Sequence, residues 1–239
     1  MKRISKLLLL GAVAGGLASA DTIVLATTPT ALGVDDTVLW DQLGSDGATI
    51  SHSFSVLSGG AISVSGVFSM TTGEVAVVGP ATTWGPASGA FNDNDALVWA
   101  FDGGASNGSG PITFTFGTNV RGVGAAIQPD CCGTFTAQIQ LYNGSTLLGS
   151  VTESSNANGD ALYIGALDQT GPAVNKAVFS LTAVLNNSNN ESNYTGDFAI
   201  DTLGLVSPAT ATPEPATFSL VVLSLAGLAW RPTRAKRAE

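Results

Sequence analysis

Short runs in which apolar and polar residues alternate recur along the sequence, and they constrain the fold more than any other feature. The clearest run covers residues 135–142, where four apolar residues alternate with polar ones: Phe135, Ala137, Ile139 and Leu141. Alternate side chains of a β-strand lie on opposite faces, so one face of this strand is apolar. Asn143-Gly144 suits the two positive φ values of a type I′ turn, and residues 147–151 then return. The sequence predicts an antiparallel hairpin here.

The rest of the body, residues 21–206, carries the same signals. It lacks helical periodicity, it is rich in Val, Ile, Thr, Ser and Gly, and turn residues recur about every ten positions. We expect an all-β domain of about twelve strands, built as an antiparallel β-sandwich of jelly-roll type. Residues 80–96 are the least regular part, and we expect a long functional or closing loop there.

The final predicted strand, residues 198–206, has a conflict in its alternation. In a regular strand, Asp197 and Asp201 would lie on the same face as Leu203 and Leu205. One face does not suit both the acids and the leucines. The strand is therefore either bulged or buried on both faces.

The N-terminus has the three parts of a secretory signal. Basic residues precede an apolar stretch over residues 7–17, and Ala18 and Ala20 frame a small-residue cleavage site. We predict a signal helix within residues 1–20, export through the Sec machinery, and a mature chain that begins at Asp21.

The C-terminus combines two prolines, an apolar run and a basic end. Residues 216–230 carry no charge and would span about 22 Å as a helix, which is short for a bilayer core of about 30 Å but sufficient for a transient or tilted span. Pro213 and Pro215 disfavour helix just before this run. The basic residues that follow favour a cytoplasmic C-terminus: Arg231, Arg234, Lys236 and Arg237. A C-terminal core helix or an ordinary tail anchor is the alternative.

This order of features resembles the PEP-CTERM sorting signal of Gram-negative bacteria. The matching parts are Pro213-Glu214-Pro215, the apolar run with Gly227-Leu228-Ala229, and the basic end at 231–239, which is less dense in arginine than the family's pattern. The resemblance implies a linker at 207–212, followed by a signal at 213–239 that an exosortase, a membrane-embedded cysteine protease, recognises and cleaves. It also implies delivery to the cell surface or extracellular matrix, as in a biofilm, often beside exopolysaccharide production.

The body is also similar to the globular domains that often precede this tail. The similarity lies in three segments: Trp40–Gly44, Gly122–Gln128 and Asp197–Leu203. The last segment resembles the final strand of lectin-like and carbohydrate-binding jelly rolls. A shared fold does not supply an activity, so the ligand has to be argued from a site.

The charge of the body is one-sided. Of the nine Lys and Arg residues, three lie in the N-terminal segment and four in the tail, which leaves Arg121 and Lys176. Of the 18 Asp and Glu residues, two lie in the tail, which leaves 16 and a net charge of about −14. This balance argues against nucleic acid and anionic membrane surfaces as partners. It is compatible with divalent cations, and equally with acids that serve solubility.

The two cysteines, Cys131 and Cys132, are adjacent and form no framework between distant strands. An exported protein meets oxidising conditions, so a vicinal disulfide in a turn before Gly133 is one interpretation. Two free thiols or an intermolecular link are the others. With one distant histidine, the pair does not make a zinc site.

Acidic side chains provide two candidate metal positions. Asp93 and Asp95 lie in one loop, near Asp102, and oxygen-rich loops suit Ca²⁺. EF-hand spacing is missing, and a solvated turn is the competing interpretation. Asp201 is the second candidate, because the resemblance to carbohydrate-binding jelly rolls implies that an acid on the last strand contributes to a structural calcium.

Three aromatic residues are candidates for stacking on sugar rings: Trp84, Tyr142 and Tyr194. Exposed aromatic rings provide an apolar face for a sugar, while Asp, Asn and Gln supply hydrogen bonds. A core anchor that closes the loop is the competing interpretation for Trp84. Trp40 and Trp99 lie among apolar neighbours and are predicted to belong to the core.

The sequence contains no motif that favours catalysis. His52 is the only histidine, no Gly-x-Ser-x-Gly motif supports it, and a surface position on a strand explains it. Carboxylate pairs for glycoside hydrolysis are not identifiable from spacing. We predict a non-enzymatic exported protein with a structural or adhesive role linked to exopolysaccharide. A calcium-dependent carbohydrate-binding module is the alternative, and a secreted hydrolase comes third.

Overall fold

The computed structural model describes residues 22–79, 84, 91–101, 108–130, 133–171, 173–185 and 195–208. These residues belong to one unit that ends at Pro208. The signal segment and the sorting tail lie outside the described residues, as do the two helices predicted in them. Within the described ranges, no helix is long and apolar enough to cross a membrane.

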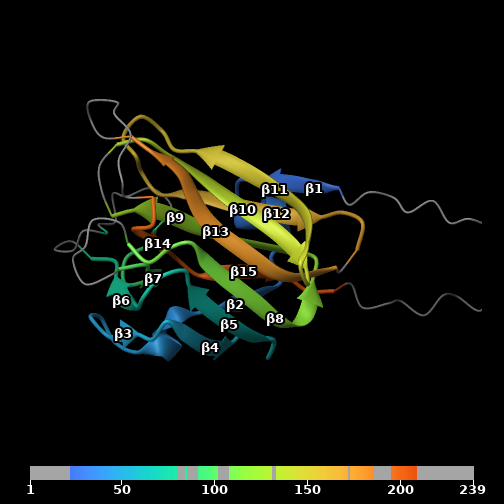
Figure 1. Cartoon of the computed structure of the whole chain (residues 1–239), viewed down its shortest axis with the longest axis horizontal. Coiled ribbons are helices and arrows are strands. Elements are labelled where there is room, and N and C mark those ends of the chain that lie inside the picture. Colours follow the sequence, from blue (N-terminus) through green and yellow to red (C-terminus); the bar gives the residue numbers. More distant parts are fainter. Residues whose placement is uncertain are drawn as a thin grey trace, which may run out of the picture. The chain divides into compact units, whose positions relative to one another are not determined.

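Two antiparallel sheets lie face to face (Figure 1), which confirms the predicted all-β sandwich. The six-stranded sheet has the order β11 (Thr146–Ser154), β10 (Phe135–Asn143), β13 (Val174–Val184), β8 (Ile112–Val120), β5 (Ser63–Phe68) and β4 (Ser53–Leu57). The nine-stranded sheet has the order β1 (Ile23–Ala26), β12 (Leu162–Asp168), β9 (Gly122–Pro129), β14 (Phe198–Ile200), β7 (Ala96–Trp99), β6 (Gly73–Val77) and β3 (Thr49–Ile50). Its other two strands are β15 (Leu203–Val206), which pairs with β9, and β2 (Asp36–Val38), which pairs with β15.

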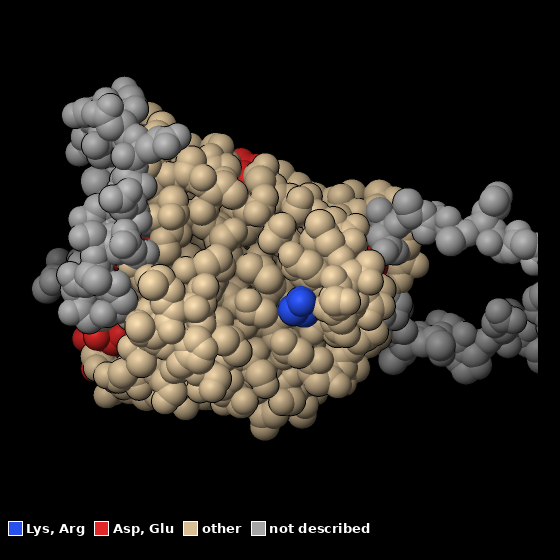
Figure 2. Space-filling view, viewed as in Figure 1, with Lys and Arg blue, Asp and Glu red and all other residues tan. Residues whose placement is uncertain are grey.

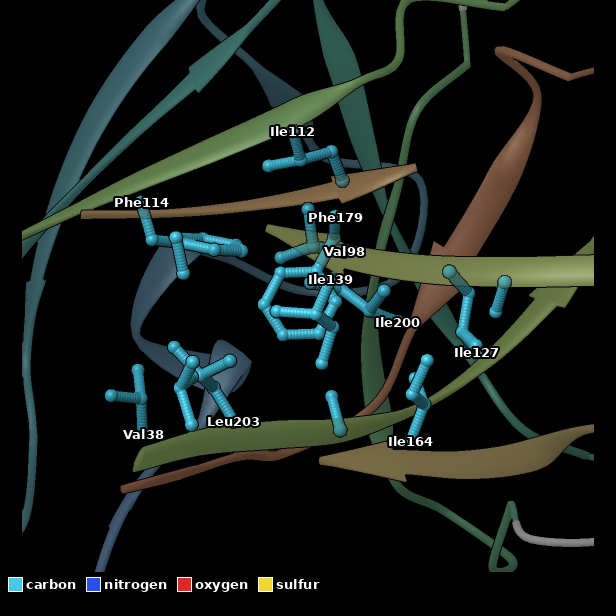
Figure 3. Packing of buried hydrophobic residues seen from close by; sticks show 14 of the residues in the cluster. Val38, Val98, Ile112, Phe114, Ile127, Ile139, Ile164, Phe179, Ile200 and Leu203 are labelled. Atoms are coloured by element: carbon cyan, nitrogen blue, oxygen red, sulfur yellow. The ribbon is translucent and has the colours of Figure 1, made fainter. Parts of the chain in front are cut away.

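The core lies between the sheets and is built from the apolar faces of alternating strands. Ile112, Phe114 and Ile139 from the six-stranded sheet pack against Ile127 and Ile200 from the other sheet (Figure 3). All five side chains are fully buried. Trp40, at the start of the 3-10 helix η1 (Trp40–Leu43), closes the core by stacking on Phe114 with ring centroids 5.7 Å apart. The core position predicted for Trp40 is therefore confirmed.

The predicted hairpin at 135–151 is present as β10 and β11, but its turn lies one residue later than expected. Asn143 pairs with Thr146, so Gly144-Ser145 forms the loop. Gly144 has a φ of 59°, and Asn143 is not among the residues with positive φ. The prediction of two positive φ values at Asn143-Gly144 was wrong. A register shift between Leu141 and Tyr142 explains the change, because an irregular pairing moves the point at which the strands close.

The nine-stranded sheet is covered on both faces, which the alternation alone did not predict. On its outer face, Leu32 of the short helix α1 (Pro29–Leu32) packs with Ala26 and Val206. Thr28 caps this helix by accepting a hydrogen bond from the Ala31 amide, and Gly33 ends it with a φ of 79°. Elsewhere on the same face, Trp84 and Phe91 pack over Leu97 and Ala199. The outer face between these two covers holds the candidate site.

Candidate functional site

The nine-stranded sheet branches next to β9, where β14 and β15 follow each other along the chain. Both β14 and β15 pair with β9, but on their other side β14 pairs with β7 whereas β15 pairs with β2. Ile200 lies opposite Ile127, and Gly204 lies opposite Gly124, so four steps on one strand match three on the other. The extra residue is a β-bulge at Asp201-Thr202, which confirms the irregularity inferred from the alternation.

The bulge holds Asp201 in a buried position. The Asp201 amide donates to the carbonyl of Ala126 at 3.0 Å, and its carbonyl accepts a hydrogen bond of 2.9 Å from Trp40 Nε1. The carboxylate Oδ1 accepts from the Thr202 amide at 2.5 Å. Only 5% of the residue is exposed. The backbone and Trp40 therefore fix a carboxyl group where the sheet divides.

A tight turn brings Asp95 to the same place. Asn94 has a φ of 66°, and the backbone of Asn94 and Asp95 exchanges hydrogen bonds with Val78. Asn92 Nδ2 donates to Asp95 Oδ2 at 2.9 Å, and the carboxyl group of Asp95 lies near that of Asp201 in the same hollow of the surface. We call Asp95 and Asp201 the acidic pair.

Burial raises the pKa of Asp201 to about 6, and the nearby charge of Asp95 adds to this increase. The hydrogen bonds from Thr202 oppose it only in part. Two carboxylates in contact need a shared proton or a cation between them, because like charges at this distance do not both ionise freely. The site therefore favours a proton, a cation or a hydrogen-bond donor from a ligand.

The acidic pair opens into a groove on the outer face of the sheet. The groove has a volume of about 330 Å³ and is lined by Pro29, Val34, Thr37, Asn92, Asp95, Ala126, Tyr163, Asp201, Thr202 and Gly204. An adjoining hollow of about 160 Å³ shares Asp95 and Thr202 with it and continues past Leu39, Trp40 and Asp41. Asp95 thus lies at the junction of the two spaces.

Tyr163 of β12 was not anticipated from the sequence as a site residue. Its hydroxyl is buried and has no hydrogen-bond partner among the described residues, and burial raises the pKa of Tyr163. A Cβ atom at Gly124 would lie 2.5 Å from this hydroxyl, and one at Gly204 would lie 3.4 Å from it. Glycines in otherwise buried strands are a sequence signal for such a close approach.

The structure brings together two of the three predicted metal-binding acids. Asp95 and Asp201 both line the groove, but Asp93 is exposed and does not. The turn at Asn94 explains this outcome, since it directs Asp93 to solvent and Asp95 inward. Within the described part of the chain, no group of three His, Cys, Asp or Glu residues is placed to hold a metal ion. The predicted grouping with Asp93 is therefore corrected to a pair, and Asp102 lies outside the described residues.

Trp84 is not available as a sugar platform, because only 2% of it is exposed. Its ring packs edge-on against Phe91 and Trp99, with centroids 6.0 Å and 5.9 Å away. The competing interpretation, a core anchor for the loop, is the one that the structure supports. Trp99 is half-buried and belongs to the same cluster, and its Nε1 donates to Asp197 Oδ1 at 2.8 Å.

Tyr142 is half-buried on β10 of the six-stranded sheet and does not line the groove, which lies on the other sheet. Its hydroxyl donates to Gln140 Oε1 at 3.2 Å, and the Lys176 ammonium group lies 4.4 Å from the centre of its ring. The third aromatic candidate, Tyr194, lies outside the described residues. So do Cys131 and Cys132, the cleavage site at Ala18 and Ala20, and the sorting residues Pro213, Glu214, Pro215, Arg231, Arg234 and Arg237.

His52 is exposed just before β4, and its Nδ1 lies 3.1 Å from the carbonyl oxygen of Thr71. A second buried acidic contact lies at the other end of β14. There, burial and the charge of Asp197 raise the pKa of Asp130 to about 6. Asp197 already accepts the hydrogen bond from Trp99. We therefore assign the ligand site to the groove.

No family model matches the chain, and no curated protein matches it. Among solved structures, the chain is similar to CsCBM6-3 from Clostridium stercorarium, which was solved in complex with cellobiose. The two are 13% identical, the match covers 72% of this chain and 92% of that one, and the TM-score is 0.24. At these values the similarity carries no argument about what this chain binds.

Proposed function

We propose that this chain is an exported, non-enzymatic β-sandwich of the bacterial cell surface or extracellular matrix, and that its groove binds carbohydrate. The observation that carries the proposal is the groove at the division of the sheet, which is lined by buried Asp201, half-buried Asp95 and the buried hydroxyl of Tyr163. Its volume of about 330 Å³ falls in the range of small-molecule sites, about 300–1,000 Å³.

The chemistry of the lining suits a polyhydroxylated ligand. Asp95 and Asp201 supply acceptors for sugar hydroxyls, whereas Asn92 and Thr202 supply both donors and acceptors. Tyr163 adds a hydroxyl that lacks a partner among the described residues, and a ligand would satisfy it. A sugar hydroxyl that donates to the acidic pair would also replace the proton that the pair otherwise shares.

Calcium is the second component that we propose for this groove. The acidic pair offers carboxylate oxygens, and Ca²⁺ accepts six to eight oxygen ligands, some of which come from water or from a sugar in an open site. A cation would offset the like charges of Asp95 and Asp201. Carbohydrate binding would then depend on calcium.

The test is retention of the secreted protein on the host's own extracellular polysaccharide, with calcium and with a chelator. We expect saturable retention that Asp201→Asn weakens at least about tenfold, a loss of about 1.4 kcal/mol of binding free energy. Asp93→Asn is the matched control. It removes the same charge from an exposed residue two positions before Asp95, and it should bind like the wild type. Equal retention of the Asp201 and Asp93 variants would contradict the proposal.

A hydrolase is the second candidate function, and the proximity of the Asp95 and Asp201 carboxyl groups is the observation that favours it, since paired carboxylates serve acid–base catalysis. The same polysaccharide, incubated with the protein and analysed for new reducing ends, decides between the two. Turnover that is lost in Asp95→Asn or Asp201→Asn would replace the binding proposal with an enzymatic one.

The export route is proposed from the ends of the sequence. If an exosortase processes the tail, replacing Pro213-Glu214-Pro215 by three alanines should leave a membrane-bound precursor in the native host. The size and location of the chain, followed by immunoblot of cell fractions, give the answer. Normal release of the alanine variant would contradict processing at this motif.

A further inference from the structure

The outer face of the six-stranded sheet is polar and nearly free of charge. Alternation along β4, β5, β8, β10, β11 and β13 buries one set of side chains and turns the other set outward. The outward set consists mainly of serine, threonine and glutamine, for example Ser65, Thr115, Gln138, Gln140, Thr152 and Ser180. It also includes three exposed apolar side chains toward the ends of the strands: Leu57, Val67 and Leu147. We call this surface the neutral face.

Within the described residues of these six strands, Lys176 is the only charged side chain that the alternation turns outward. The space-filling view along the same direction as Figure 1 shows a broad surface almost without acidic or basic side chains (Figure 2). This surface contrasts with the body as a whole, whose net charge is about −14. Among the described residues of the six strands, the alternation turns no acidic side chain toward this face.

The pairing of the strands gives the neutral face a regular grid. Ser65 lies opposite Thr115, Thr115 opposite Lys176, and Lys176 opposite Tyr142. Neighbouring hydroxyls contact each other, as in Ser55 with Ser65 at 3.3 Å and Thr136 with Ser154 at 3.1 Å. With strands about 4.8 Å apart, six strands span about 24 Å. The face is thus wide enough for several residues of an extended polymer.

The composition of the face selects the class of partner. Protein interfaces are enriched in aromatic residues, Met and Arg and depleted in Ser, which does not fit this surface. Nucleic acid and anionic polymers need clusters of basic residues, and this face offers Lys176 alone. Hydroxyls and amides that both donate and accept hydrogen bonds match rows of sugar hydroxyls. We propose that the neutral face binds an extended, uncharged polysaccharide, at a site separate from the groove on the other sheet.

Microcrystalline cellulose, an extended and uncharged polysaccharide, is the probe. We expect the full secreted chain to bind it saturably, and soluble hydroxyethylcellulose to release the chain more effectively than anionic carboxymethylcellulose. Gln138→Glu and Ser180→Glu each place a carboxylate on the neutral face and should weaken binding about tenfold, because the charge loses hydration on contact with the polymer. Thermal unfolding of each variant checks that the fold is retained.

Gln169→Glu adds the same charge at an exposed position after β12, on the other sheet, and is the matched control that should bind like the wild type. A chelator should leave cellulose binding unchanged, which separates this proposal from the groove, whose proposed binding depends on calcium. The proposal is overturned if the wild-type chain does not bind, if the variants of the neutral face bind as well as the Gln169 control, or if the chelator abolishes binding.

Discussion

Asp201 is the residue on which the account of the groove depends. An aspartate that is 5% exposed and lies beside a second carboxyl group is costly to ionise, and its pKa of about 6 expresses this cost. The bulge explains why the chain tolerates it, because the backbone of Ala126 and the ring of Trp40 hold the residue on both sides. A buried polar contact of this kind is often retained for a site rather than for stability.

The pKa of Asp201 predicts how stability changes with pH. A carboxyl group whose pKa rises from 3.8 to about 6 on folding favours the folded state at low pH. That contribution is fully present below about pH 4 and is lost as the pH rises through 6. As the pH rises, this effect lowers the free energy of unfolding of the wild type by at most about 3 kcal/mol. Asp201→Asn should remove much of this decrease, so the variant should be more stable than the wild type at pH 7.5.

Urea unfolding at pH 4, 5, 6 and 7.5 measures this effect, with Asp93→Asn as the control. Some decline should persist in the Asp201 variant, because the pKa of Asp130 is also raised to about 6. If the free energy of unfolding of the Asp201 variant fell with pH as steeply as that of the wild type, the acidic pair would not share a proton in the folded protein.

At the scale of elements, the sequence predicted the strands better than their irregularities. The alternation in residues 135–142 predicted the buried face of β10 correctly, because side chains with a period of two fall on one face of a strand. The bulge at Asp201-Thr202 was visible as a conflict between acids and leucines. The partner change from β7 to β2 was not predictable, since it depends on contacts between strands distant in the sequence.

The loop around Trp84 shows a second limit of sequence reasoning. Glycine, proline and asparagine surround this tryptophan, which is typical of an exposed loop, yet the ring is buried against Phe91 and Trp99. The sequence feature that indicated burial was Leu97 on the outer face of β7, because an apolar side chain there has to pack against another segment. A period-two pattern does not reveal which distant segment supplies that cover.

Trp84→Ala should therefore destabilise the domain rather than act on a ligand. Removing a buried tryptophan costs about 3–5 kcal/mol of unfolding free energy. Tyr142→Ala, at a half-buried position, should cost clearly less. Chemical denaturation of both variants provides the measurement. A stable Trp84 variant that has lost glycan binding would contradict the anchor role and restore the earlier hypothesis of a sugar platform.

At the scale of the whole molecule, the outer faces of the two sheets differ in character. One sheet carries a partly covered outer face with the groove that holds the acidic pair, and the other carries a neutral face with few charges. The sequence alone indicated the fold class and the proposed route of export. It placed Asp95 and Asp201 among the candidates but missed Tyr163, because a tyrosine in a short strand has no spacing that marks it as a site residue.

The most direct test of the central claim is to locate the ligand on the ¹⁵N-labelled mature protein by nuclear magnetic resonance. Soluble fragments of the host's extracellular polysaccharide would be titrated in the presence of calcium. The account predicts saturable amide shifts at Asn92, Asp95, Thr202 and Gly204, which line the groove, and their loss in Asp201→Asn but not in Asp93→Asn. Saturable binding without shifts at these four amides would contradict the assignment of the groove as the carbohydrate site.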